Sequence, residues 1–207
     1  MSEKIETQYV FPIPIRKYKM STLNKDRIDE IIKFINKDTS LIEKGSLGSH
    51  SVTQDFLKKD IFKDISKEIL DCVNYFSLAE GHKCKDIRIA SSWVNKLKRD
   101  QYIHPHGHPN SYISGTIHLT KGAELIFQQP HVKEMYHISI EDRNSLEKIS
   151  ISSEPGNLIL FPSKLIHSVN MHKGYLDRYS IAFNTMPMIY GPNTSFVNLT
   201  EDIVTNG

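Results

Sequence analysis

Two stretches in the first half of the chain carry apolar side chains at helical spacing. The first has isoleucines at i, i+3, i+4 and i+7, which predicts an amphipathic helix over residues 24–36. The second predicts a helix over about residues 60–78, with Cys72 on the same apolar face. We expect both helices to cover one side of the structure that follows. The apolar positions are Ile28, Ile31, Ile32 and Ile35 in the first helix and Ile61, Ile65, Ile69, Val73 and Phe76 in the second.

After Gly81 the apolar positions alternate with a period of two, which is typical of strands. The segments are short and are separated by turn signals such as Pro155-Gly156 and Lys173-Gly174. This arrangement predicts a mainly β fold, either a sandwich or a barrel. The predicted strands lie at residues 87–95, 112–119, 123–127, 149–152, 157–161, 167–169 and 178–183.

Segments without a clear period are expected to connect or flank these elements. Residues 9–15 are apolar but contain two prolines, so they predict an edge strand or an extended arm. Residues 39–58 are predicted to be a loop beside a site, and residues 128–148 a polar insertion. We expect a single domain over 1–207, with an N-terminal arm and covering helices (1–82), a β core (83–190) and a tail (191–207).

Composition adds few constraints. A hydrophobic content of 39% and a charged content of 24% are ordinary for a globular protein. Twenty-six basic and 24 acidic residues nearly balance, which gives no indication of a nucleic-acid partner. Cys72 and Cys84 are too few for a disulfide framework, and no apolar run approaches the ~20 residues that span a bilayer. We therefore expect a soluble, cytoplasmic protein with no membrane association.

Three histidines at alternate positions, His104, His106 and His108, provide the first candidate site. Prolines at 105 and 109 favour extended backbone, in which residues i, i+2 and i+4 share a face. Neutral imidazole is the commonest protein metal ligand, so the cluster predicts a metal site. A solvated histidine-rich loop is the alternative.

Two residues much later in the chain strengthen the metal hypothesis. His167 follows an apolar strand and a proline turn, and Arg178 opens another apolar strand. An arginine in that position is expected to meet an anion, because a buried charge is costly without a partner. The alternatives are an arginine that snorkels at the strand end or one that pairs with Glu124 or Asp177.

Taken together, these motifs resemble the Fe(II)- and 2-oxoglutarate-dependent oxygenase superfamily, and more closely the small oxygenases of this class found in marine bacteria and their phages. The resemblance spans residues 93–184 and implies a double-stranded β-helix, or jelly roll, with iron in its mouth. It is carried by Trp93-Val-Asn95, His106-Gly-His-Pro-Asn-Ser111, Ser114-Gly115, Pro155-Gly156, Phe161-Pro162, His167 and Arg178-Tyr-Ser-Ile-Ala-Phe-Asn184.

The resemblance implies three metal ligands, His106, His108 and His167. Most of the superfamily has a carboxylate at the position of His108, so this chain departs from the two-His-one-carboxylate pattern. The alternatives left open are that His108 lies outside the ligand set or that His104 replaces His106 as the first ligand. For the cosubstrate, the implied contacts are Arg178, Ser180, His118 and Asn95.

The implied activity is an Fe(II)-dependent dioxygenase reaction. It uses 2-oxoglutarate and O2, forms succinate and CO2, and hydroxylates a small molecule or peptide that the sequence does not identify. A homodimer is left open. Two other functions remain: a non-catalytic or 2-oxoglutarate-independent metal-binding jelly roll, and a cupin-type isomerase or dioxygenase, which would need no carboxylate clamp at Arg178.

Overall fold

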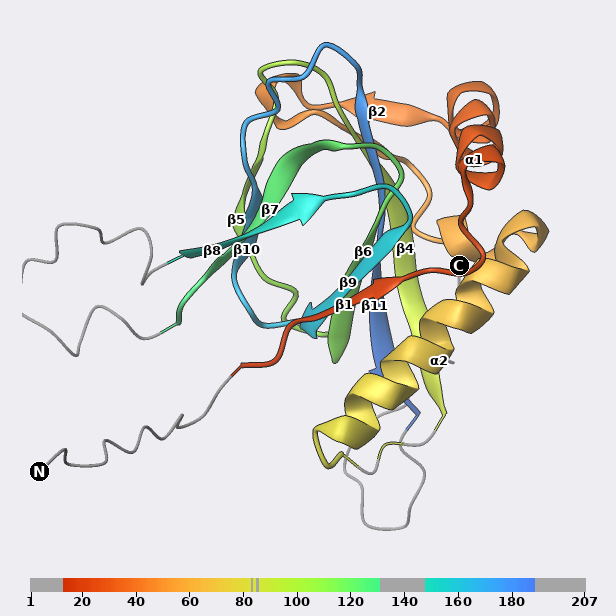
Figure 1. Cartoon of the computed structure of the whole chain (residues 1–207), viewed down its shortest axis with the longest axis vertical. Helices are drawn as coiled ribbons and strands as arrows, with labels where there is room; N and C mark the ends of the chain where they lie inside the picture. Colours follow the sequence, from red (N-terminus) through yellow and green to blue (C-terminus); the bar gives the residue numbers. More distant parts are fainter. Residues whose placement is uncertain (1–12, 83, 85, 131–147, 189–207) are drawn as a thin grey trace, which may run out of the picture.

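The computed structural model describes residues 13–82, 84, 86–130 and 148–188 (Figure 1). Most of the predicted arm at 9–15, nearly all of the predicted insertion at 128–148 and the predicted tail lie outside these residues. Two antiparallel sheets pack face to face, and two helices cover one of them. This is the predicted jelly roll. No helix in the described part of the chain is long and apolar enough to cross a membrane.

The larger sheet has seven strands and forms the back of the molecule. Alternation along its central strands divides their side chains between two faces, so that one face packs on the helices and the other faces the smaller sheet. In spatial order the strands are β1 (Arg16–Lys19), β9 (Asn157–Pro162), β6 (Ile113–His118), β11 (Arg178–Pro187), β4 (Ile87–Leu97), β3 (Ser49–Ser51) and β2 (Leu41–Glu43).

The smaller sheet has four strands and closes the sandwich. Its order is β5 (Ile103–His106), β10 (His167–Val169), β7 (Gly122–Gln128) and β8 (Lys148–Ser153). Between the sheets lies a compact apolar cluster that includes Leu125, Phe127 and Phe161. The cluster fills only part of the sandwich, so the opposite end of the space between the sheets remains available to polar side chains.

Helices α1 (Lys25–Asp38) and α2 (Lys63–Ala79) confirm the two helical predictions, with α2 preceded by a 3-10 turn, η3 (Asp60–Phe62). Asn24 caps α1 by accepting a hydrogen bond from the Arg27 backbone N–H at 2.9 Å. The predicted apolar stripes are buried against the larger sheet, where they form the main hydrophobic core. Burial of each such side chain contributes roughly 1.5–3 kcal/mol.

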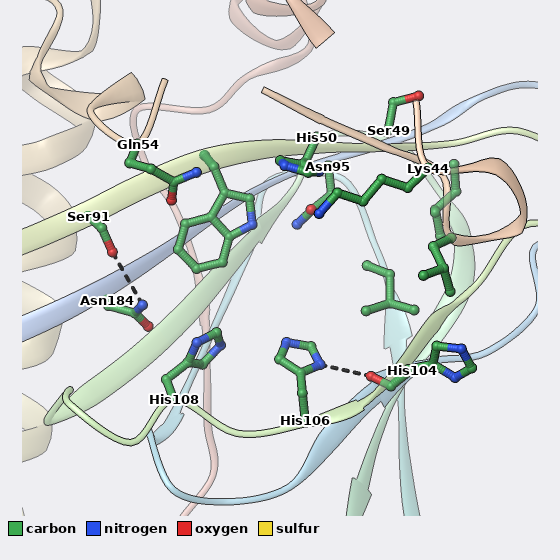
Figure 2. A pocket seen from close by; sticks show the side chains of 14 residues that line it. Lys44, Ser49, His50, Gln54, Ser91, Asn95, His104, His106, His108 and Asn184 are labelled. Atoms are coloured by element: carbon green, nitrogen blue, oxygen red, sulfur yellow. Dashed lines mark hydrogen bonds between the residues drawn. The ribbon is translucent and has the colours of Figure 1, made fainter. Parts of the chain in front are cut away.

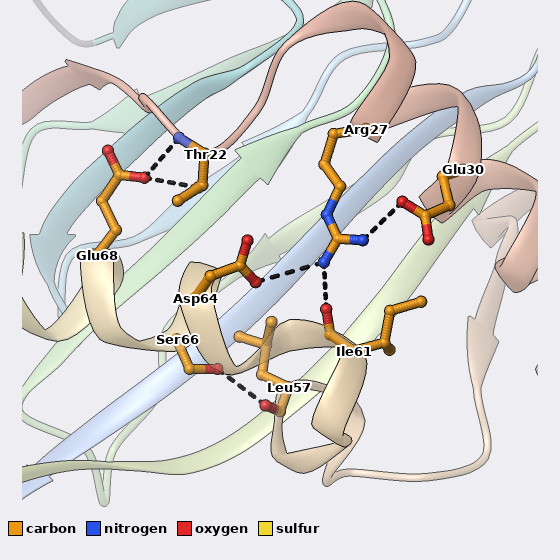
Figure 3. Close-up of polar contacts among 8 residues, drawn as sticks. All are labelled: Thr22, Arg27, Glu30, Leu57, Ile61, Asp64, Ser66 and Glu68. Carbon is orange, nitrogen blue, oxygen red and sulfur yellow. Dashed lines mark hydrogen bonds and ion pairs between the residues drawn. The ribbon is translucent and has the colours of Figure 1, made fainter.

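Polar contacts attach the two helices to each other and to the chain that leads toward the sheets (Figure 3). Arg27 on α1 donates to Glu30 at 2.6 Å, to Asp64 on α2 at 3.3 Å and to the Ile61 carbonyl. Glu68 on α2 accepts two hydrogen bonds from Thr22, at 3.0 and 2.6 Å, just before α1 begins. The helices therefore form one support behind the larger sheet.

The first described strand is β1, which begins at Arg16, directly after the predicted arm at 9–15. One prediction for the N-terminal half needs correction. Residues 39–58 are not a loop. They form β2, a 3-10 turn η1 (Gly45–Leu47), β3 and a second 3-10 turn η2 (Phe56–Lys58), and β3 pairs with β4.

Gly48 determines whether this β2–β3 hairpin can close. Its φ is +75°, and a Cβ there would lie 2.7 Å from the Lys96 carbonyl and 2.3 Å from Leu97 Cδ2. Gly45 has φ +57°, but a Cβ there would meet nothing within 4 Å. We predict that Gly45→Ala costs about 1 kcal/mol of unfolding free energy, from backbone strain alone.

Gly48→Ala should cost at least about 1 kcal/mol more, because backbone strain and overpacking act together. Urea denaturation of both variants measures the difference. Equal losses would show that the contact of the hairpin with β4 is not tight.

Candidate metal centre

Three histidine rings converge at the open end of the space between the sheets. The candidate ligand atoms of His106, His108 and His167 all lie within 4.8 Å of one another. Their ring centroids are 4.4 Å apart for His106 and His167, 5.1 Å for His106 and His108, and 5.2 Å for His108 and His167. The structure thus brings together the three histidines predicted as metal ligands.

Strand pairing accounts for the approach of two of these rings. His106 ends β5 and His167 begins β10, and the two are direct partners in the antiparallel ladder. The chain leaves the strand at Gly107, where a Cβ would come within 3.2 Å of the Lys164 carbonyl. The His108 backbone N–H then donates to Ser163 at 2.8 Å, which holds the third imidazole beside the pair.

Backbone carbonyls set the tautomers of two rings. The Nδ1 of His106 lies 2.8 Å from the His104 carbonyl, and the Nδ1 of His167 lies 2.9 Å from the Leu165 carbonyl. A carbonyl oxygen can only accept, so each Nδ1 carries the proton. The Nε2 lone pair of each ring is left for a metal, the arrangement usual for metal-binding histidines.

His104 does not join this cluster. Its ring packs edge-on against Tyr102, with centroids 4.9 Å apart, and it lines the outer rim of the site (Figure 2). The expectation that three alternate histidines share one face is therefore wrong for His104. The cluster instead takes its third ring from His167 on β10, while His108 joins it from two residues beyond the end of β5.

Burial keeps His108 and His167 uncharged at neutral pH. Desolvation, and then the neighbouring His106, lower the pKa of His108 to about 4. Desolvation also lowers the pKa of His167 to about 4 against the opposing effect of its Leu165 hydrogen bond. Neutral imidazole is the form that binds a metal. Among the described residues, no carboxylate belongs to the cluster.

Arg178 lies between the two sheets, and only 1% of its surface is exposed to solvent. Its guanidinium donates to the Ala123 carbonyl at 3.1 Å, to Ser180 at 3.1 Å and to Ser153 at 3.3 Å. Its Nη2 also lies 3.3 Å from the Nδ1 of His118, and burial lowers the pKa of the guanidinium to about 10, so it stays protonated at neutral pH.

The acidic partners considered for Arg178 do not meet it. Asp177 pairs instead with Lys96 at 3.0 Å, and no ion pair of Glu124 is found among the described residues. In that part of the chain every acceptor of the guanidinium is neutral. The buried charge of Arg178 is therefore uncompensated, which favours the prediction of an external anion.

The other three predicted cosubstrate residues form one row across the larger sheet. Ser180 on β11 is the ladder partner of Asn95 on β4 and of His118 on β6. His118 is fully buried, and its Nε2 has no hydrogen-bond partner among the described residues. Burial, and then Arg178, lower the pKa of His118 to about 3, so it is neutral and accepts through Nδ1.

Two connected cavities meet at the histidines. The inner one, about 70 Å³, reaches from the cluster to Arg178 and Ser180. The outer one, about 480 Å³, opens to solvent above His106 and His108 (Figure 2). Asn95 and the two histidines line both cavities, so the cluster lies where they join.

Sequence reasoning missed several residues of these cavities. Ser153 contacts Arg178 from β8, and Asn184 accepts a hydrogen bond from Ser114 at 2.6 Å in the wall of the outer cavity. Lys44 and His50 reach the same cavity from the hairpin that was predicted to be a loop. For Lys44 and His50, the only signal in the sequence was the prediction that residues 39–58 lie beside a site.

The jelly roll, the histidine cluster and the buried arginine agree with the predicted resemblance to non-haem iron oxygenases that use 2-oxoglutarate. A sequence model of the family described as "Putative 2OG-Fe(II) oxygenase" matches residues 91–184. Residues 91–184, a little under half of the chain, thus match a family of Fe(II)- and 2-oxoglutarate-dependent oxygenases. No curated protein sequence matches the chain. The likeness to marine and phage enzymes stays a prediction.

Solved structures share the fold of this chain. HygX from Streptomyces hygroscopicus, crystallised with nickel and 2-oxoglutarate, superposes with a TM-score of 0.63 at 11% identity, over 86% of this chain and 84% of its own. The epimerase SnoN of nogalamycin biosynthesis gives 0.63 at 11%, over 84% and 78%. A Pseudomonas putida prolyl-4-hydroxylase gives 0.59 at 9%, over 85% and 94%. At these identities the likeness concerns the fold.

The lowered pKa of His167 predicts a pH-dependent stability of the metal-free protein. In the unfolded chain His167 binds a proton near pH 6.5, and in the folded chain only near pH 4. Its contribution to the free energy of unfolding is therefore fully present above about pH 6.5 and is lost as the pH falls toward 4. For this one residue the loss is about 3 kcal/mol.

Urea unfolding of chelator-treated protein across this pH range measures the effect. His167→Gln should flatten the profile by about one proton, whereas the exposed His104→Gln should leave it unchanged. Identical profiles for wild type and His167→Gln would contradict the assignment.

Proposed function

We propose that this protein is an Fe(II)- and 2-oxoglutarate-dependent dioxygenase that oxidatively decarboxylates 2-oxoglutarate to succinate and CO2 and hydroxylates a second substrate. The observation that carries the proposal is the pairing of two sites across one cavity. A cluster of three histidines lies at one end, and a buried guanidinium without an acidic partner in the described chain lies at the other.

The donor set fits a divalent metal. Two rings present Nε2 lone pairs because their Nδ1 protons are engaged by carbonyls, and the third ring is neutral. Three imidazoles suit a borderline ion such as Fe(II). A structural metal site is normally closed by four protein ligands, whereas this cluster offers three and opens into two cavities. His106, His108 and His167 would therefore hold a metal with positions left for other ligands.

The inner cavity fits a dicarboxylate. Arg178 can present its planar fork to one carboxylate, and Ser180 shares the same strand face. The other end of the molecule would reach the metal held by the histidines. Asn95 lines this cavity in the same cross-strand row as Ser180, and its amide supplies a further polar contact. His118 does not line the cavity and acts through its contact with Arg178.

When bound, Fe(II) and 2-oxoglutarate would supply the oxidising power drawn from O2. The protein's own contribution is position and exclusion of water. Arg178 fixes the cosubstrate from a site that is almost completely buried, while the walls of Phe161 and Leu125 keep the inner cavity apolar around it. The outer cavity leaves the opposite side of the histidines accessible to a second substrate.

Replacing each ligand histidine by alanine should abolish stoichiometric metal binding, because two imidazoles leave too few donors for a stable site. His104→Ala, with its ring outside the cluster, is the matched control and should keep the metal. Metal content after anaerobic reconstitution with Fe(II) measures this. Full metal content in His167→Ala would refute the ligand set. Loss of metal in His104→Ala, with retention in His108→Ala, would show that His104 and not His108 is a ligand.

Arg178→Ala removes the partner of a buried carboxylate, so 2-oxoglutarate should bind on the order of 30- to 4,000-fold more weakly. Arg178→Lys keeps the charge but loses the planar fork, so it should not restore the full affinity. Metal content should not change, because Arg178 is not a ligand. Calorimetric titration with 2-oxoglutarate, together with the melting temperature of the same preparation, tests this. A lowered melting temperature with an unchanged dissociation constant would assign Arg178 a structural role instead.

A further inference from the structure

The outer cavity has a one-sided charge. Its 14 lining residues include one permanent cation, Lys44, and no aspartate or glutamate. Most of the remaining polar lining consists of amides, hydroxyls and imidazoles. Within the described residues Lys44 forms no ion pair.

Two acidic residues on or beside the strands that line this cavity pair with other lysines. Glu43, next to Lys44 in the chain, pairs with Lys98 at 2.6 Å. Asp177 pairs with Lys96 at 3.0 Å, on the strand that also carries Asn95. The charge of Lys44 is therefore not neutralised by its neighbours, and it contributes a positive potential to the cavity.

Hydrogen-bond donors surround the lysine. In Figure 2 the Lys44 side chain extends toward His50 and Asn95, above the ring of His106. His50 is the ladder partner of Asn95, and its partial burial and the charge of Lys44 lower its pKa. A neutral His50 offers one N–H, and Asn95 offers two. An ammonium group with such donors beside it is suited to an anionic group.

The rest of the cavity is suited to a carbon skeleton. Trp93, Leu47 and Leu97 contribute apolar walls, and Trp93 packs against His108 with ring centroids 5.6 Å apart. A molecule held by its anionic end at Lys44 would lay its body along these walls toward His106 and His108. This places C–H bonds, rather than the charge, near the histidine cluster.

We propose that the outer cavity takes a substrate with an anionic group, a carboxylate or a phosphate, which Lys44 binds with help from His50 and Asn95. This inference rests on the proposed function and names the class of its second substrate. It is separate from the cosubstrate site, because Lys44 lines only the outer cavity and Arg178 only the inner one. The enzyme then has two anion sites, one for each substrate.

The test uses Mn(II) as a paramagnetic probe, with 2-oxoglutarate at saturation and under nitrogen. The ligands are two matched pairs: 4-methylpentanoate with 4-methylpentanamide, and 3-methylbutyl phosphate with 3-methylbutanol. Relaxation enhancement of their methyl protons reports both binding and closeness to the metal. The variants are Lys44→Gln, Lys44→Arg and, as a matched surface control on α1, Lys37→Gln.

We expect the anionic member of at least one pair to bind more tightly than its neutral analogue. Lys44→Gln should weaken that binding about fivefold, Lys44→Arg should largely restore it, and Lys37→Gln should not alter it. Added salt should weaken binding of the anionic probe and leave binding of the neutral analogue unchanged. Tighter binding of the carboxylate than the phosphate, or the reverse, identifies the anionic group.

Equal binding of charged and neutral probes, or an unchanged dissociation constant in Lys44→Gln, would overturn this inference while Mn(II) and 2-oxoglutarate still bind. Failure of the wild-type protein to bind Mn(II) or 2-oxoglutarate would instead overturn the proposed function and, with it, this inference. The two failures are read from separate titrations of the same sample.

Discussion

The buried guanidinium of Arg178 is the interaction on which the geometry of the site depends. It donates to Ser180 on the larger sheet and to Ala123 and Ser153 on the smaller one, so a single side chain connects the two layers. Those contacts use some of its five N–H donors and leave its charge without an acidic partner in the described chain, and a buried unpaired charge is expensive. The fold therefore maintains a position at which an anion lowers the free energy of the folded state.

Much of the fold follows from local patterns. Two isoleucine-rich stripes at helical spacing specify α1 and α2, and alternation along β4, β6 and β11 specifies which side chains face the helices. The same alternation places Arg178, Ser180 and Ala182 on the opposite face, so half of the candidate site was also predictable. Because strand pairing is antiparallel, His106 and His167 could be expected to meet once β5 and β10 were recognised.

The remaining parts depend on contacts that no short window of sequence contains. The hairpin of β2 and β3 has weak strand propensity and forms because β3 adds to β4, about 45 residues away. Lys44 and His50 therefore reach the site through tertiary pairing. His104 shows the opposite failure, since it alternates regularly with His106 in β5 but its ring packs against Tyr102, outside the cluster that His108 joins from beyond the strand end.

Charge connects these observations. Neither cavity is lined by an acidic side chain, and the histidine cluster brings no negative charge. A divalent metal would add two positive charges between Arg178 and Lys44, giving a total of four along one path. A dicarboxylate offsets two of these, and an anionic second substrate offsets more. Each anion should therefore bind more tightly when the metal is present, and by linkage each should raise the affinity for the metal by the same factor.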